Sequence, residues 1–267
     1  MSDNYKHEDY SDPEASAGLI EKISRITPIE LTDDDLEKIN SYALSPLKSG
    51  DVFAFKATIA DNVDDDRNYM PFDLQALKDL KELYPGKTVL LDHRAVVNNQ
   101  IARVYDTELR RGSGNTGKRT LGGDHTELIA KIYMLRTKSN SDLIAEISGG
   151  IKKEVSTTTL PAKMVCSICG VDNLKEYCRH YPGREYEAKN DDGEIIHKRC
   201  RMVLSGATDA YEMSFVAIPA QPRAGTYKSI GFKKPFSEPE TAPKTDNKQA
   251  KRLLSLRIKA AENQFEF

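Results

Sequence analysis

The chain has 267 residues, which is long enough for one sizeable hydrophobic core with appended segments. Hydrophobic residues make up 39% of it and charged residues 30%, and the net charge of -2 excludes a global electrostatic attraction to nucleic acid or to a membrane surface. No stretch approaches the roughly 20 apolar residues of a membrane span, and the acidic N-terminus lacks the layout of a signal peptide. The sequence therefore predicts a cytosolic protein that has no contact with a membrane.

The first predicted helix lies within residues 27–44. Thr32 is placed to cap its first turn, and the three aspartates that follow it complement the positive end of a helix dipole. Leu36, Ile39 and Leu44 supply an apolar side with helical spacing.

A strand, a helix and a second strand are predicted next. Residues 51–60 alternate and are rich in aromatic and β-branched side chains, which favours a strand. Leucines at helical spacing predict a helix over 71–86 that Pro85 and Gly86 end. The apolar run in 87–94 predicts a short strand.

Further strands are predicted at 100–110 and 127–136 from their alternation, separated by a loop that is rich in glycine. Ser141 is then placed to cap a helix over 142–148. The chain is expected to return to a strand at 151–159.

Composition divides the chain into three parts. Residues 1–18 carry one lysine against five acidic residues and are expected to be a disordered acidic segment. Residues 19–232 are predicted to form the folded domain, with a cysteine-rich insert at 160–201 and a last strand at 209–220. Residues 233–267 are expected to be a mobile linker followed by a short basic helix that docks on a partner.

Many short strands with two or three helices predict an α+β fold, specifically an antiparallel β-barrel with flanking helices.

Three residues on separate predicted strands suit nucleophilic catalysis. Ser156 lies on a strand that emerges after two glycines, and His93 closes an apolar strand. A serine hydroxyl needs a neighbouring base, and imidazole is suited to that task at neutral pH. A carboxylate is the usual group that orients the imidazole, and Glu212 is the preferred candidate, with Asp92 and Asp209 as alternatives.

All four cysteines lie within the insert, and in a reducing compartment a metal is the leading explanation for them. Cys166 and Cys169 have the spacing of a zinc knuckle. The predicted ligands of a structural Zn²⁺ are Cys166, Cys169 and Cys178 with either His180 or Cys200 as the fourth, and His197 is a further candidate. A closed shell of four protein ligands leaves no position for an activated water, so this zinc has no expected role in catalysis.

The segments VLLDHR, IARVYDTEL, LIAEISGGIKKEVS, CSICG and AYEMSFVAIPAQPRAG together resemble the prohead proteases of tailed bacteriophages, a family of serine proteases related to the herpesvirus assemblins. The resemblance covers roughly residues 50 to 230. It places the family's catalytic histidine, serine and acid at His93, Ser156 and Glu212, and it implies a zinc knuckle like that of a subset of the family. One departure is the run of threonines at 157–159, where many members have a small apolar residue and glycine.

The resemblance implies an endopeptidase that cleaves the capsid scaffold, the N-terminal extension of the major capsid protein and itself. It would act in the cytoplasm of a bacterial host, inside the immature prohead, and self-association is a further expectation.

Two other functions are compatible with the residues. A non-catalytic assembly factor would use the insert and the basic C-terminal helix for docking on scaffold or capsid protein. A zinc-ribbon nucleic-acid binder would use the basic and aromatic residues of the insert, although its acidic residues weigh against that function. Those basic and aromatic residues are Arg179, Arg184, Tyr186, Lys198, Arg199 and Arg201.

Overall fold

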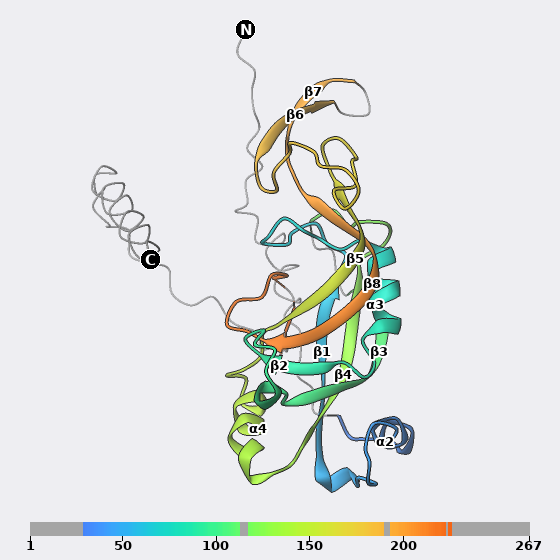
Figure 1. Ribbon diagram of the computed structural model, residues 1–267, viewed down its shortest axis with the longest axis vertical. Helices are drawn as coiled ribbons and strands as arrows, with labels where there is room; N and C mark the ends of the chain where they lie inside the picture. The colour runs from blue at the N-terminus through green and yellow to red at the C-terminus, as the bar shows by residue number, and fades with distance from the viewer. Residues whose placement is uncertain (1–28, 113–116, 190–192, 223, 226–267) are drawn as a thin grey trace, which may run out of the picture. The chain divides into compact units, whose positions relative to one another are not determined.

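The computed structural model describes residues 29–112, 117–189, 193–222 and 224–225, and it is a mixed α+β fold dominated by one sheet (Figure 1). The expectations for 1–18 and for 233–267, including the basic helix, fall outside these residues. The α-helices and strands in chain order are α2 (Asp33–Asn40), β1 (Val52–Asp61), α3 (Leu74–Leu83), β2 (Thr88–Leu91), β3 (Ala102–Arg111), β4 (Thr126–Leu135), α4 (Ser141–Ser148), β5 (Val155–Cys166), β6 (Glu185–Lys189), β7 (Ile195–Arg199) and β8 (Met202–Phe215).

The main sheet has six strands in the order β1-β4-β3-β2-β8-β5 and curls into a half-barrel. The predicted α+β class is confirmed, but the expected fully antiparallel barrel is not, because β2 and β8 pair in parallel. That pairing joins segments more than 100 residues apart, so no local sequence pattern predicts it. Irregular register within β1–β4, β3–β4 and β5–β8 adds local twist, which favours a curled sheet.

Gly225 links the two edges of this sheet. It forms isolated β-bridges with Thr58 of β1 and with Glu154, the residue before β5. Its φ of 154° lies in a region that favours glycine, and an added Cβ would lie 2.8 Å from the carbonyl oxygen of Lys153. Glycine is therefore required for the chain to pass between the edge strands here.

The hydrophobic core lies between the curled sheet and helix α3. Leu77 and Leu80 of α3 are fully buried, as is Tyr84 directly after it. They pack with inward-facing residues such as Phe55 and Met213. Asp73 caps α3 by accepting a hydrogen bond from the backbone of Ala76 at 2.8 Å.

Two details of the predicted helices are wrong. Leu44 lies beyond α2 and is fully exposed, because the helix ends at Asn40. Ser141 is the first residue of α4, and Asn140 occupies the cap position without a side-chain hydrogen bond.

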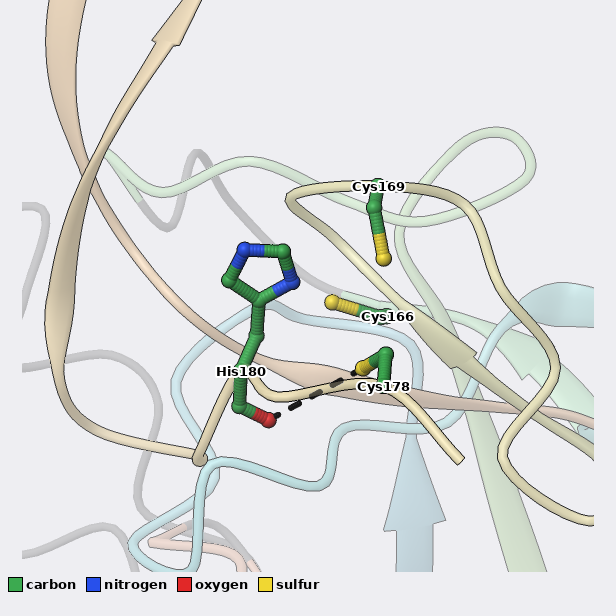
Figure 2. Close-up of side chains that lie close together, drawn as sticks. All are labelled: Cys166, Cys169, Cys178 and His180. Carbon is green, nitrogen blue, oxygen red and sulfur yellow. Dashed lines mark hydrogen bonds between the residues drawn. The ribbon is translucent and has the colours of Figure 1, made fainter. Parts of the chain in front are cut away.

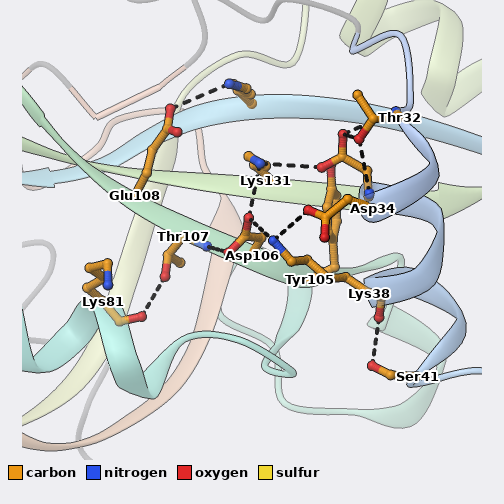
Figure 3. A network of polar contacts seen from close by, with 12 residues as sticks. Thr32, Asp34, Lys38, Ser41, Lys81, Tyr105, Asp106, Thr107, Glu108 and Lys131 are labelled. Carbon is orange, nitrogen blue, oxygen red and sulfur yellow. Dashed lines mark hydrogen bonds and ion pairs between the residues drawn. The ribbon is translucent and has the colours of Figure 1, made fainter.

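Helix α2 is fastened to the outside of β3 and β4 by a polar network (Figure 3). Lys131 contacts Asp35 at 3.3 Å and Asp106 at 3.0 Å, and Lys38 contacts Asp106 at 3.1 Å. Burial acts to raise the pKa of Asp35, but hydrogen bonds from Thr32 and the charge of Lys131 outweigh it and hold that pKa below its ordinary value. The buried carboxylate therefore stays ionised and paired, which fixes the helix on the sheet.

The cysteine-rich insert begins later than the sequence suggested. Strand β5 continues through residues 160–166 as a partner of β8, and the register ends with Cys166 opposite Met202. The insert proper lies between these two residues and contains the antiparallel hairpin β6–β7. Paired strands on both sides therefore hold the ends of the insert together.

Candidate active site and metal centre

His93 lies on a tight turn two residues past the end of β2. Asp92 and His93 both have left-handed backbones, with φ of 55° and 53°. A non-glycine residue in this conformation costs about 1–3 kcal/mol and is found preferentially at functional sites. The backbone N–H of His93 donates to Ser214 Oγ at 3.1 Å, which holds the turn against β8. The sequence predicted a histidine at the strand end, and the turn now fixes where its ring points.

Glu212 of β8 is the carboxylate that contacts this histidine. His93 Nδ1 lies 2.7 Å from Glu212 Oε1, and the side chain of Glu212 is only 9% exposed whereas that of His93 is 39% exposed. Because an ionised carboxylate only accepts hydrogen bonds, this contact places the imidazole proton on Nδ1. Nε2 is left with its lone pair and has no hydrogen-bond partner among the described residues.

Ser156 lies on the same face of the sheet as Glu212. In the antiparallel register Ser156 is opposite Ser214 and Thr158 is opposite Glu212, so all four side chains project to one side. Ser156 and His93 both line a cleft of about 320 Å³. The hydroxyl of Ser156 makes no hydrogen bond within the described part of the chain, to His93 included.

The other two candidate carboxylates do not reach the histidine. Asp209 pairs instead with Lys87 at 2.9 Å, and that ion pair lowers the pKa of Asp209. Asp92 belongs to the turn itself, and Glu212 is the carboxylate that His93 contacts.

Sequence reasoning missed two polar side chains around Glu212. Thr158 Oγ1 donates to Glu212 Oε1 and lies 3.3 Å from His93 Nδ1. Ser214, which is fully buried, donates to Glu212 Oε2 while it accepts from the backbone of His93. In a strand, a spacing of two residues places Thr158 on the same face as Ser156, and Ser214 on the same face as Glu212. That the two pairs face each other follows only from the register of β5 and β8.

Three cysteines and one histidine of the insert form a cluster that can hold a metal ion (Figure 2). The ligand atoms of Cys166, Cys169, Cys178 and His180 all lie within 4.8 Å of one another. Figure 2 shows the three sulfur atoms pointing toward one another with the imidazole beside them. Cys178 and His180, although only two residues apart, therefore reach the same point.

The backbone around Cys166 has the features of a metal-binding knuckle. The N–H of Ile168 points at Cys166 Sγ at 3.4 Å, and the N–H of Gly170 donates to the carbonyl of Cys166 at 2.9 Å. Gly170 has a φ of 74°, which lets the chain turn back beneath the sulfur. Amide groups directed at a sulfur stabilise a thiolate, the form that binds metal.

Two observations bear on the fourth ligand. His180 Nδ1 is buried without a hydrogen-bond partner in the described structure, and such an orphaned acceptor is explained by a ligand. Cys200 lies outside the four-residue group, with its sulfur 3.9 Å from Cys166 Sγ. The geometry thus favours His180 as the fourth ligand over Cys200, which lies against the cluster. His197 is exposed on β7 and is not part of the cluster.

The thiols of the cluster differ in acidity. Burial raises the pKa of Cys166, Cys169 and Cys200. Burial also acts to raise the pKa of Cys178, but hydrogen bonds from the His180 backbone and from Asn173 outweigh it and lower the value to about 6.

The basic residues of the insert are largely engaged within the protein. Arg199 pairs with Glu185 at 2.8 Å, Arg201 pairs with Asp64, and Lys198 donates to the carbonyl of Ser167 at 2.7 Å. Cations that are already paired give weak support to a phosphate-binding surface.

Within the described residues, no helix is both long and apolar enough to cross a membrane. No family model, curated protein or solved structure matches the chain.

Proposed function

We propose that this protein is a serine endopeptidase in which Ser156 is the nucleophile, His93 the general base and Glu212 the orienting acid. The observation that carries the proposal is the 2.7 Å contact between His93 Nδ1 and Glu212 Oε1, made at the rim of the cleft that Ser156 also lines. Such a contact selects the tautomer in which Nε2 is able to accept a proton.

In the first half of the reaction, His93 Nε2 takes the proton of the Ser156 hydroxyl as its oxygen attacks the peptide carbonyl carbon. A C–O bond forms, and the carbonyl π pair moves onto the oxygen. When that pair returns, the C–N bond breaks, and the leaving amine takes the proton from His93. An ester on Ser156 and a free amine result.

In the second half, water attacks the ester and gives a proton to His93 Nε2. The C–O bond to Ser156 breaks, the serine oxygen regains the proton from His93, and a carboxylic acid is released. Glu212, held by Thr158 and Ser214, stabilises the imidazolium in both halves because it is nearly buried and ionised beside the ring.

We propose further that this endopeptidase is of the prohead protease type. It is supported by the chain order of His93, Ser156 and Glu212, by the curled sheet in which Ser156 and Glu212 lie on neighbouring strands, and by the cysteine insert after the serine strand. The corresponding substrates are scaffold, the major capsid protein extension and the protease itself, cut inside the immature head.

The metal of the insert is proposed to be zinc in a structural role. Three thiolates and one imidazole are the ligand set that suits tetrahedral zinc, and they complete its shell without a water. A small second core packs around the cluster, formed by insert residues such as Tyr186 together with Met202 at its end and Met70 of the β1–α3 connection. Bound zinc would hold this small core together.

His180→Ala is expected to weaken zinc binding by more than about tenfold, because it removes one of four ligands. The measurement is zinc content per chain together with competition against a chromogenic chelator. His197→Ala is the matched control, since it removes an exposed histidine of the same insert, and it is expected to bind as the wild type does. Wild-type affinity in His180→Ala together with loss in Cys200→Ala would assign the fourth position to Cys200, and a zinc content near zero in the wild type would remove the proposed metal.

A fluorophosphonate that reacts with activated serines tests the nucleophile directly. The folded protein is expected to gain one adduct, located at Ser156 by peptide mass spectrometry, and heat-denatured protein is expected to gain none. Ser205→Ala, which removes a serine of β8 that pairs with β5 outside the cleft, should label normally. Absence of an adduct at Ser156 in folded protein would contradict the proposed function.

A further inference from the structure

Asp66 is a nearly buried carboxylate in the cleft that holds Ser156 and His93. It precedes a short turn in the β1–α3 connection, and it is 6% exposed. The turn holds only one of its oxygens, because Oδ1 accepts the backbone N–H groups of Asn68 at 2.8 Å and Met70 at 3.1 Å. Oδ2 has no hydrogen-bond or ion-pair partner among the described residues.

No cation in the described structure neutralises this carboxylate directly. The described residues that line the cleft include no lysine or arginine. Arg201, whose charge does act on Asp66, forms its ion pair with Asp64, and the guanidinium of Arg67 donates to the carbonyl of Pro219. Burial raises the pKa of Asp66, as expected for a carboxylate that is desolvated without a full partner.

The cleft that holds this carboxylate has both apolar and polar walls. Ile59, Met70, Phe72 and Leu204 give it hydrocarbon surface, while Asn68, Gln221 and the threonines at 157–159 add uncharged polar groups. A cleft that combines hydrocarbon surface with a nearly buried carboxylate matches a side chain with a hydrocarbon stem and a cationic tip. A neutral apolar side chain would leave the carboxylate unpaired, and an acidic one would be repelled.

We infer that the cleft selects a substrate with lysine or arginine beside the bond that is cut, and that Asp66 is the specificity-determining residue. The inference rests on the proposed peptidase function. Asp66 forms an ion pair with the basic tip of the substrate, while the apolar walls cover its stem. Desolvation inside the cleft strengthens this pair relative to one on the surface.

The test uses two peptidyl diphenyl phosphonates that are identical except for the residue next to phosphorus, which is lysine in one and norleucine in the other. Ser156 attacks phosphorus and expels phenoxide, so the rate of adduct formation reports recognition. The wild type is expected to react at least about tenfold faster with the lysine compound. Asp66→Asn keeps the backbone hydrogen bonds to the turn and is expected to lose this preference, while its rate with norleucine changes less than threefold.

Asp209→Asn is the control for charge, because it removes a partly exposed carboxylate that pairs with Lys87 outside the cleft, and it is expected to keep the preference. Equal rates for the two compounds in the wild type, or an unchanged preference in Asp66→Asn, would overturn the inference. Neither result would contradict the proposal that Ser156 is the nucleophile. If neither compound nor the simple fluorophosphonate modifies Ser156, the proposed peptidase function is contradicted, and the inferred specificity, which rests on it, is contradicted as well.

Discussion

Ser156→Ala is expected to lower peptide-bond cleavage by about a million-fold, because it removes the only group from which the covalent acyl intermediate is proposed to form. His93 and Glu212 do not replace it, since a base without a nucleophile retains little of the catalytic power of such a triad. The measurement is co-expression with the scaffold and capsid proteins, with the masses of all products determined for the wild type and the variant.

Ser205→Ala serves as the matched control, since it deletes a hydroxyl from the paired strand β8 away from the cleft, and its products should equal those of the wild type. Ser156 is only partly buried and makes no side-chain hydrogen bond among the described residues, so its loss should leave the melting temperature nearly unchanged. Equal trimming by Ser156→Ala and wild type would end the peptidase assignment and favour the non-catalytic assembly factor.

Glu212→Gln is expected to lower the rate of peptide cleavage by about ten-thousand-fold with little change in substrate affinity. An amide in place of the carboxylate neither stabilises an imidazolium nor enforces the proton on His93 Nδ1. Thr158 and Ser214 donate to different oxygens of the carboxylate, and an amide has only one accepting oxygen, so one of these hydroxyls loses its acceptor in the variant. The measurement is kcat and KM on a substrate processed by the wild type, with the rate of Ser156 phosphonylation as a second readout.

Glu127→Gln is a demanding control for this variant. Glu127 is also a nearly buried strand glutamate, and it pairs with Arg110 at 2.7 Å, outside the cleft. Its replacement should lower stability without lowering kcat. If Glu212→Gln lost no more activity than Glu127→Gln, the carboxylate of Glu212 would be structural, and the orienting role would have to be reassigned.

Local signals were sufficient for most of the secondary structure. Thr32 and Asp35 form the capping box of α2, and the buried leucines of α3 follow the predicted helical spacing. Strands β3 and β4 were visible from alternation alone. These features depend on residues that are only a few positions apart in the chain, which is why a single sequence reveals them.

The cluster that can hold a metal ion was also largely predictable, because its cysteines and histidine lie close together in the chain and a CxxC spacing lets both sulfur atoms reach one ion. The fourth ligand was left open between His180 and Cys200, since sequence distance does not say which side chain points inward. The folded insert brings His180 Nδ1 to the sulfurs and leaves Cys200 beside Cys166.

Residue type and short spacing were enough to predict the helices, most of the strands and the cysteine cluster, whereas His93, Ser156 and Glu212 were predicted from separated motifs that resemble those of the prohead proteases. Only the tertiary structure decided that β2 runs parallel to β8, so that His93 meets Glu212, and that Thr158, Ser214 and Asp66 belong to the same site. The reason is physical. Strand register and partner choice depend on packing among segments far apart in the chain, and a shift of one residue would turn the side chains of Thr158, Glu212 and Ser214 to the opposite face.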